Sequence, residues 1–208
     1  MQQQMIEQMT AWLETLAEEE RIEAINRFRL ALHRVSPFSD QPIDCVLWVK
    51  QTLIAPNAYN PNSVAPPEKR LLQKSLEADG FTQPIVVYEK DKLHYEIVDG
   101  FHRHELAKTK AQLKKQLKGY QPISVLQHGR SRVSSRMAST IRHNRARGRH
   151  QINAMAEIVR ELTQLGWNDT TIGEELGMDA DEVLRLRQIN GLQDLFGDRQ
   201  FSQAWTVK

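Results

Sequence analysis

The sequence predicts an α+β domain that is followed by an all-helical region. Between residues 44 and 126 the apolar pattern gives the order strand, helix, strand, strand, helix, strand, which is typical of a compact α+β domain. After Gln151 the apolar residues recur only at helical spacing. We therefore expect five segments: a helical extension (1–42), the α+β domain (43–128), an arginine-rich connector (129–150), a helical subdomain (151–195) and a tail (196–208).

The N-terminal extension is expected to form one amphipathic helix over residues 3–34. Apolar residues such as Ile6, Leu13 and Phe28 recur at helical spacing, with charged residues between them. The turn-forming residues of segment 36–42 then end the helix. Such a helix packs on the main domain or on a second copy of itself, so we expect a homodimer or a partner protein.

The α+β domain is expected to contain a strand with its continuation, a turn-rich loop, a helix, a strand pair, a second helix and a last strand. These elements are predicted at 44–54, 56–62, 67–79, 83–88 with 93–98, 102–119 and 122–126. The predicted buried stripe of the first helix is Leu71, Leu72, Ser75 and Leu76, and Gly80 is its expected cap.

The stretch Tyr95–Lys108 holds the candidate chemistry. Asp99-Gly100 ends a strand, and His102-Arg103 opens the next helix. A helix N-terminus binds anions through its unpaired backbone N–H groups, and an arginine there can hold a phosphate with two parallel bonds. Asp99 could bind a metal ion, orient a water or accept a proton. The alternative is an ordinary strand–turn–helix with a surface histidine and arginine. His104, on the same helix turn, could also be drawn toward a phosphate.

Charge is distributed unevenly along the chain. The net charge is −5 over residues 1–100, +12 over 101–150 and −5 over 151–208. A block of +12 directly after the candidate phosphate turn indicates binding to nucleotides or nucleic acid. A solvated basic face, or an arginine-rich linker without fixed structure, is the alternative. The arginines of this block that we expect on DNA are Arg130, Arg132, Arg136, Arg142 and Arg149.

Composition excludes several classes of protein. No apolar run approaches the roughly 18 residues that span a membrane, and the acidic N-terminus is unlike a secretory signal. The single cysteine, Cys45, cannot form an intramolecular disulfide or a zinc site made of cysteines. We therefore expect a cytoplasmic protein with no membrane partner.

The helical subdomain has the spacing of a helix-turn-helix. Helices are predicted at 153–165, 170–176 and 180–190, with a glycine-containing turn before the third. The third helix begins with three acidic residues among Asp179–Glu182, which would repel DNA phosphates. Arg185 and Arg187 remain for DNA contact. A packing or dimerisation unit is the alternative.

Several motifs, in order, resemble the ParB/sulfiredoxin superfamily over residues 44–190. They are Asn57-x-Tyr-Asn-Pro61, Leu71-x3-Ser75, Gly80-x2-Gln-Pro-Ile-Val-Val87 and Tyr95-Glu-Ile-Val-x-Gly100 with His102-Arg103. The resemblance implies a small mixed sheet with helices, followed by a helix-turn-helix-like subdomain. It is less specific for activity, because one scaffold hosts several activities.

Three branches of the superfamily imply different site residues. Sulfiredoxins carry a catalytic cysteine where this chain has Phe101, so that activity is not expected. Partition proteins bind CTP with magnesium through a box similar to 143–147, which implies Asn144 on Mg²⁺ and Arg147 on phosphate; His143 replaces the acid tied to hydrolysis. We also expect Arg145, which lies between them, to bind phosphate. Free-serine kinases have a box similar to 99–103, in which Asp99 would be the general base.

We expect a ParB-like, nucleotide-binding and DNA-binding transcriptional regulator. Phosphates of CTP, ATP or ADP would bind Gly100, His102 and Arg103, with a magnesium ion, and the site would be coupled to DNA or partner binding. A small-molecule kinase is the alternative and a non-catalytic partner protein the third; a weak triphosphatase activity also stays open. Nuclease activity is not expected, because no carboxylate cluster suits two-metal cleavage.

Overall fold

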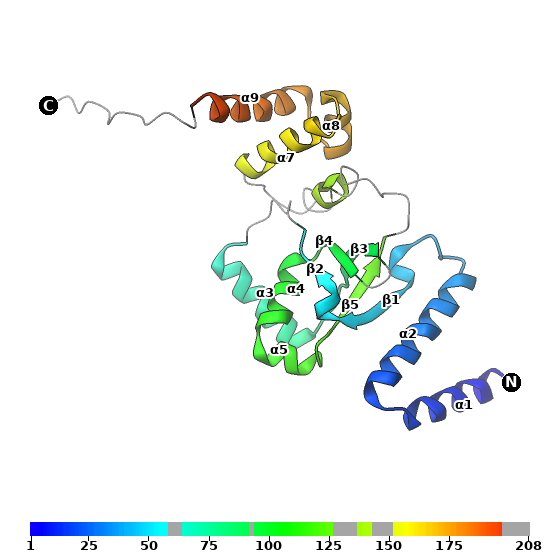
Figure 1. The fold of residues 1–208 in the computed structure, drawn as a ribbon. Coiled ribbons are helices and arrows are strands. Elements are labelled where there is room, and N and C mark those ends of the chain that lie inside the picture. The colour runs from blue at the N-terminus through cyan, green and yellow to red at the C-terminus, as the bar shows by residue number, and fades with distance from the viewer. Residues whose placement is uncertain (58–63, 92–93, 127–136, 143–151, 197–208) are drawn as a thin grey trace. The chain divides into compact units, whose positions relative to one another are not determined.

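The computed structural model describes residues 1–57, 64–91, 94–126, 137–142 and 152–196. The chain forms two compact units (Figure 1). The first, called the sheet unit, comprises Met1–Asn57 and Val64–Arg130, and the second, called the helical unit, comprises Ala58–Ser63 and Ser131–Lys208.

A five-stranded mixed sheet is the centre of the sheet unit, as expected for the α+β class. Its strands are β1 (Val46–Lys50), β2 (Ile54–Ala55), β3 (Ile85–Asp91), β4 (His94–Asp99) and β5 (Tyr120–Val125), in the order β1-β5-β3-β4-β2. Two pairs, β1 with β5 and β3 with β4, are antiparallel. The pairs β3 with β5 and β2 with β4 are parallel.

The sheet curls until its two edges lie near each other. β1 and β2 are opposite edge strands, yet only the single 3-10 turn Gln51–Leu53 joins them. In a flat sheet four strand spacings would separate these edges by about 19 Å. The four residue steps from Lys50 to Ile54 span at most about 14 Å, so the sheet must be curved. The strand predicted with its continuation over 44–54 is thus divided by this turn into β1 and β2, which pair with different strands.

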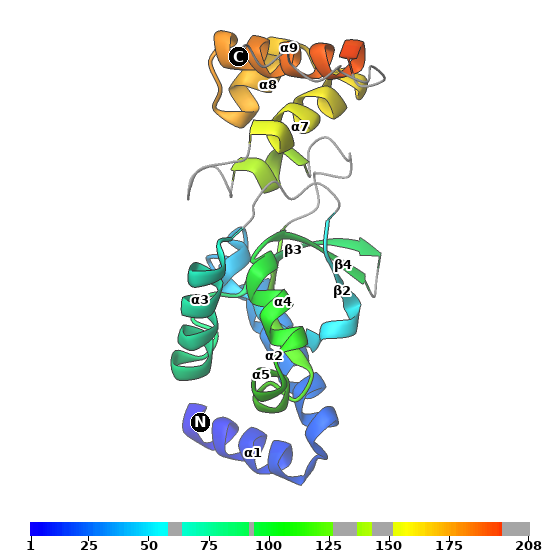
Figure 2. The same cartoon turned by 90° about the vertical axis from the view of Figure 1, so that its left-hand side faces the viewer.

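Helices α3 (Pro66–Asp79), α4 (Phe101–Thr109) and α5 (Ala111–Gln116) pack together through Leu76, Leu106 and Leu113 (Figure 2). The inner face of the sheet is filled by Ile54, Ile85, Val87, Ile97 and Ile123. Two expectations fail here. Leu71 and Ser75 of the predicted α3 stripe are exposed, and the predicted helix 102–119 is interrupted at Lys110, whose backbone is extended.

The N-terminal extension forms two helices instead of the predicted single one: α1 (Gln2–Thr15) and α2 (Glu18–Val35). Three consecutive glutamates, 18–20, form the first turn of α2, where the helix dipole favours negative charge. Arg21 Nη2 donates to the carbonyl oxygens of Glu14 and Leu16 at 3.2 and 3.0 Å, which satisfies acceptors at the end of α1. Helix α1 buries none of its residues.

Asn26 attaches α2 to the open edge of β1. Its side-chain Nδ2 donates to the Trp48 carbonyl at 2.7 Å, and the Trp48 amide donates to Asn26 Oδ1 at 3.0 Å. An edge strand presents unpaired backbone groups that can pair with another chain. Asn26 therefore substitutes for a neighbouring strand at this position.

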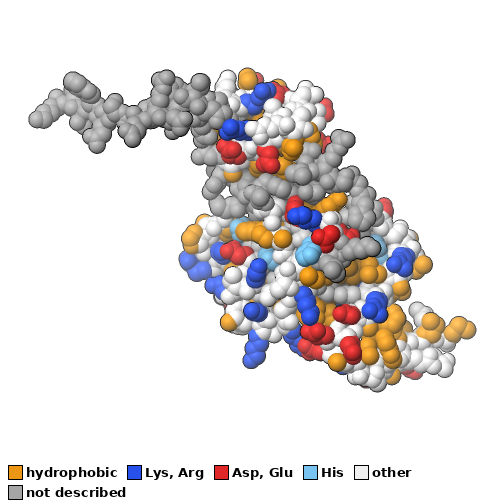
Figure 3. Space-filling view, viewed as in Figure 1, with side chains coloured by type: hydrophobic (Ala, Val, Ile, Leu, Met, Phe, Trp, Pro, Cys, Tyr) orange, Lys and Arg blue, Asp and Glu red, His pale blue; other side chains and the backbone are white. Residues whose placement is uncertain are grey.

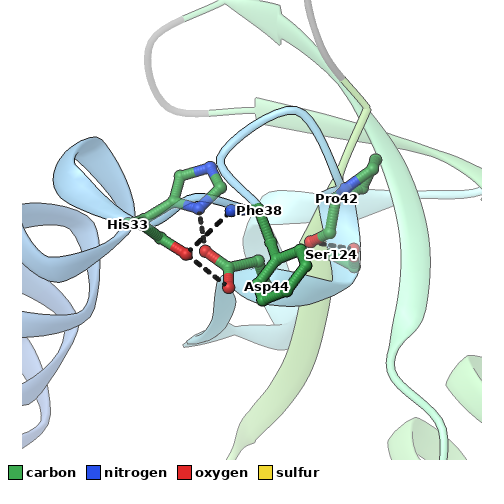
Figure 4. Close-up of polar contacts among 6 residues, drawn as sticks. His33, Phe38, Pro42, Asp44 and Ser124 are labelled. Carbon is green, nitrogen blue, oxygen red and sulfur yellow. Dashed lines mark hydrogen bonds and ion pairs between the residues drawn. The ribbon is translucent and has the colours of Figure 1, made fainter.

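A second polar contact fixes the end of α2 (Figure 4). His33 Nδ1 donates to Asp44 Oδ2 at 2.6 Å, and the Ser36 hydroxyl donates to Asp44 Oδ1 at 3.0 Å. The hydrogen bond from His33 is the main reason why the pKa of Asp44 lies below its ordinary value. Ser124 on β5 donates to the Pro42 carbonyl at 2.6 Å, so the segment after α2 is tied to the sheet.

The helical unit has a core of its own. Its helices are α7 (Ile152–Gln164), α8 (Asp169–Leu176) and α9 (Ala180–Phe196). A helical stretch at 137–142 adds Met137, Ala138 and Ile141 to this core, all with no exposed surface. This part of the predicted connector 129–150 is thus packed structure. The rest of the connector and the tail after residue 196 lie outside the described residues.

Candidate functional site

Gly100 makes the sharp turn between β4 and α4. Its backbone is left-handed, with φ 96° and ψ 18°. A Cβ at this position would lie 3.0 Å from Arg103 Nη2 and 3.3 Å from the Cα of Ile85, which is fully buried. Glycine is required for both reasons, because it alone adopts this conformation cheaply and leaves room for β3. The predicted strand–glycine–helix arrangement at this position is confirmed.

Arg103 is largely engaged by the protein itself. Its Nη1 donates to the backbone carbonyl of Gln83 at 3.0 Å and to the side-chain Oε1 of Gln83 at 3.1 Å. Its Nη2 lies 3.8 Å from Asp99 Oδ2, and only 13% and 10% of the two side chains are exposed. The guanidinium of Arg103 thus links the first turn of α4 to Gln83, which lies just before β3. A phosphate at this turn would have to share or displace these contacts.

The remaining residues of the turn differ in their surroundings. His102 is half-buried and makes an edge-to-face contact with Phe101, with ring centroids 5.2 Å apart. Asp99 is 8% exposed. The carboxylate of Asp99 therefore reaches little solvent in this conformation, and the Arg103 guanidinium lies beside it.

His104 belongs to the core, and the expectation that it turns toward a phosphate is wrong. It is 3% exposed, and its Nδ1 donates to Gln121 Oε1 at 2.7 Å. Gln121 Nε2 in return donates to the His104 carbonyl at 3.3 Å. Burial lowers the pKa of His104 below its ordinary value, and the hydrogen bond with Gln121 only partly opposes that effect.

Gln83 is the residue that sequence reasoning missed at this site. It supplies two of the acceptors that hold Arg103, although it lies twenty positions earlier in the chain. Its place directly before Pro84 and β3 is the only local signal. Asn57 also supports this region, because its Nδ2 donates to the Ile97 carbonyl of β4 at 2.7 Å.

Many of the predicted binding residues lie outside the described part of the chain. They are Asn144 for magnesium, Arg145 and Arg147 for phosphate, and Arg130, Arg132, Arg136 and Arg149 for DNA. Within the described ranges, no group of three or more His, Cys, Asp or Glu side chains could hold a metal ion.

The helical unit contains a helix-turn-helix. α8 ends at Gly177, whose backbone is left-handed, and α9 follows after a short turn in which Asp179 Oδ1 accepts from the Glu182 amide at 2.7 Å. Gly173 permits the close approach of the turn, because a Cβ there would lie 2.9 Å from the Met178 carbonyl oxygen. Asn168 caps α8 by accepting from the Thr171 amide at 2.8 Å.

Two of the three described arginines expected on DNA pair with acids of their own unit. Arg187 Nη1 lies 2.8 Å from both carboxylate oxygens of Asp169, and Arg142 pairs with Glu175. Arg185 is exposed on α9. The two pairs join α8 to α9 and to the stretch 137–142, which makes them part of the framework of the unit.

None of the described helices is both long and apolar enough to cross a membrane.

Family models match two parts of the chain. The model described as the ParB N-terminal domain matches residues 39–127, and the one described as the IbrB-like C-terminal HTH domain matches residues 150–198. The uncharacterized protein YbdM of Escherichia coli (strain K12) is 64% identical over 208 residues, which make up 100% of this chain and 98% of that protein.

Solved structures of ParB proteins are more distantly similar. The C-terminally truncated ParB of Caulobacter crescentus complexed with CTP-gamma-S is 17% identical, with a TM-score of 0.39 over 70% of this chain and 78% of that one. The form complexed to the centromeric parS site is 18% identical, with a TM-score of 0.45 over 72% and 76%. A Pnob8-like ParB-N domain is 12% identical, with a TM-score of 0.46 over 74% and 73%.

The two family models match the regions in which the sequence predicts a ParB-like domain and a helix-turn-helix, whereas the solved structures are too dissimilar to transfer the details of a site. The resemblance predicted from the sequence is thereby confirmed. The chain belongs to the same family as YbdM, and it carries a ParB-like N-terminal domain followed by a helix-turn-helix domain.

Proposed function

We propose that the protein is a ParB-like DNA-binding regulatory protein whose DNA contact depends on a nucleotide held at the Gly100–Arg103 turn. The observation that carries the proposal is the α8–turn–α9 geometry, which coincides with the helix-turn-helix match at 150–198. α9 exposes Arg185 and Gln188 on its surface. Side chains of these types contact DNA phosphates or base edges when such a helix lies in the major groove.

The charges on α9 indicate that residues outside this helix contribute most of the binding to DNA phosphates. Asp181 and Glu182 stand in the first turn of α9, where they repel DNA, and Arg187 is occupied by Asp169. Neutralisation of phosphates therefore falls to the arginines of segment 129–150 other than Arg142, which pairs with Glu175. In this proposal α9 orients the complex while the arginine-rich segment supplies most of the affinity.

The DNA-binding part is tested by fluorescence anisotropy on a labelled duplex of random sequence at rising salt. We expect the affinity to fall steeply with salt, and Arg185→Ala to reduce the salt slope by about 1 because one phosphate contact is lost. Arg70→Ala, which removes an exposed arginine of α3, is the matched control and should leave both quantities unchanged. Binding that is insensitive to salt, or equal effects of the two substitutions, would contradict the proposal.

The nucleotide part rests on the backbone donors expected at the start of α4, beside Arg103 and His102. The probes are CTP, ATP, ADP and GTP with magnesium, and the measured quantity is the rise in melting temperature. A nucleotide at a hundredfold excess over its dissociation constant adds about 2.7 kcal/mol to the free energy of unfolding. Asn144, Arg145 and Arg147 remain proposed ligands of the metal ion and the phosphates.

Two substitutions separate a phosphate contact from a structural role of Arg103. Arg103→Ala removes the guanidinium, whereas Gln83→Ala weakens its anchoring and leaves it in place. We expect the nucleotide-dependent rise in melting temperature to disappear only in Arg103→Ala. If it survives there, or disappears equally in both variants, Arg103 does not bind phosphate directly.

The kinase alternative requires Asp99 to reach the hydroxyl of a substrate. Its low exposure and its position 3.8 Å from Arg103 suit a residue that holds the turn together. Asp99→Asn distinguishes the two roles in an assay of phosphoryl transfer to free serine with ATP or ADP. Loss of transfer with retained nucleotide binding would support the kinase, and an absence of transfer by the unmodified protein would remove it.

A further inference from the structure

A hollow of about 380 Å³ lies between α2, β1 and the turn from α5 to β5, within the sheet unit. Its walls include the apolar and aromatic side chains Ile22, Ile25, Trp48, Leu117 and Tyr120. Figure 3 shows hydrophobic side chains gathered over this N-terminal part of the molecule. The volume falls in the range of roughly 300–1,000 Å³ that small-molecule sites occupy. The hollow is separate from the Gly100 turn, none of whose residues line it.

The cations at this hollow outnumber the acids. Arg21, Arg29 and Lys118 line it together with one acid, Glu18, which gives a net charge of +2. Glu18 is already paired with Lys118. The next acid of α2, Glu19, is also occupied, because it lies 3.2 Å from Lys50. The two arginines are thus left without a carboxylate among the residues that the structure describes.

The hydrogen bonding of Arg21 and Arg29 also indicates that an acceptor for them is missing among the described residues. Arg21 donates through Nη2 to backbone carbonyls only. Arg21 Nε and Arg29 Nη1 are buried, and neither has a hydrogen-bond partner within the described ranges. Buried guanidinium donors are normally satisfied, so an acceptor other than the described residues is indicated. Arg21 and Arg29 are about 2.2 helical turns apart on α2, and both line the hollow.

We propose that this hollow binds a small organic carboxylate with a flat apolar body. The body would pack on Ile25, Trp48 and Tyr120, and the carboxylate would be held by the guanidinium of Arg29 with support from Arg21. A planar guanidinium binds a carboxylate through two parallel bonds, and these are stronger where solvent is partly excluded. A singly charged head group matches walls that are mostly apolar better than a phosphate, which would need more donors.

Such a ligand would join parts of the fold that are distant in sequence. α2 forms one wall, while Trp48 of β1 and the residues after α5 form the others. Asn26 already holds α2 to β1 on the same side. Binding should therefore slow hydrogen exchange in α2 and in the turn at 117–119, and leave α9 unaffected.

The test compares naphthalene-2-carboxylate with its neutral amide, naphthalene-2-carboxamide, on the full chain by isothermal titration calorimetry. We expect the carboxylate to bind at least about tenfold more tightly than the amide, since the amide loses the charge-assisted bonds. The indole N–H signal of Trp48 should shift at a concentration of the carboxylate at least about tenfold lower than the concentration of the amide that gives the same shift. Equal binding of both probes, or binding of neither, would overturn the proposal.

Substitutions on α2 locate the site. Arg29→Met keeps the length of the side chain and should weaken binding of the carboxylate by at least about tenfold. Arg27→Met is the matched control, because Arg27 is 82% exposed and pairs with Glu23 outside the hollow. If Arg29→Met lowers the melting temperature too far for a titration, Ile25→Phe fills the hollow instead and should also abolish binding. Unchanged affinity in these variants overturns the proposal.

A second copy of the chain is the other occupant that the same experiments can reveal. Sedimentation would then show a dimer that dissociates in Arg29→Met, and the carboxylate would not bind to the unmodified protein. That combination would replace the ligand site with an interface. A monomer, or a dimer, that binds the carboxylate agrees with the proposal.

Discussion

Replacing Gly100 with alanine should destabilise the sheet unit more than any simple backbone penalty explains. An alanine in the left-handed region costs about 1–2 kcal/mol relative to its ordinary conformations. At Gly100 the added Cβ also meets the Ile85 backbone at 3.3 Å and Arg103 Nη2 at 3.0 Å. The arginine can move, but Ile85 is fully buried in β3 and cannot. Overpacking of this kind costs typically about 1–3 kcal/mol, so the expected total is about 2–5 kcal/mol.

Gly119→Ala is the control, because Gly119 has a similar positive φ of 81° and a Cβ added there would meet nothing within 4 Å. It should lose only the backbone part, about 1–2 kcal/mol. Native-state hydrogen exchange at the amides of β5 reports the stability of the sheet unit directly, since β5 is bonded on both sides. Equal losses of stability in the two variants would show that the backbone at Ile85 can move at little cost. The close approach of β3 to the turn would then not contribute to the cost of a side chain at Gly100.

Three further outcomes follow from polar contacts of the sheet unit. Asn26→Ala should lower the free energy of unfolding by about 1–3 kcal/mol in urea denaturation, because the partly buried backbone groups of Trp48 lose both partners; an unchanged midpoint would contradict this. Burial lowers the pKa of His104 in the fold, whereas in the unfolded chain this residue gains a proton below about pH 6.5, so the unfolded chain binds the proton at a higher pH than the fold does. Stability should therefore fall as the pH drops below that value, less so in His104→Gln, and equal pH slopes would refute the assignment. Asp44 has its pKa lowered chiefly by His33, so its contribution is present at neutral pH and is lost as the pH falls below about 4. Asp44→Asn should remove that part of the acid-induced loss, and an equal loss of stability between neutral and acidic pH in the two proteins would speak against it.

The sequence contains enough local information to predict the strand pair and the turn that follows it. A short apolar run at 85–88 predicts β3, the apolar residues among 95–98 predict β4, and Asp99-Gly100 before His102-Arg103 predicts the start of α4. Gly177 likewise marks the end of α8. Each of these signals lies within a few residues of the element it specifies, and the structure confirms them.

Other features depend on residues far apart in the chain. Gln83 holds Arg103 across twenty positions, and β1 and β2 separate because each finds a different partner strand. The break between α1 and α2 is a different case, since the apolar pattern continues through it. The three glutamates that begin α2 are the sequence signal for a new helix N-terminus, because the helix dipole favours negative charge there. The apolar periodicity alone does not show this break.

The hydrogen bonds of Asn26 have a practical consequence for work on isolated domains. A fragment that starts at residue 43, where the sequence predicts the start of the ParB-like domain, would retain every strand of the sheet but lose Asn26 and the helix that carries it. The edge of β1 would then be open to the same edge of a second fragment. Self-association of such a fragment would be a product of the truncation, and it would not inform on how the whole chain assembles.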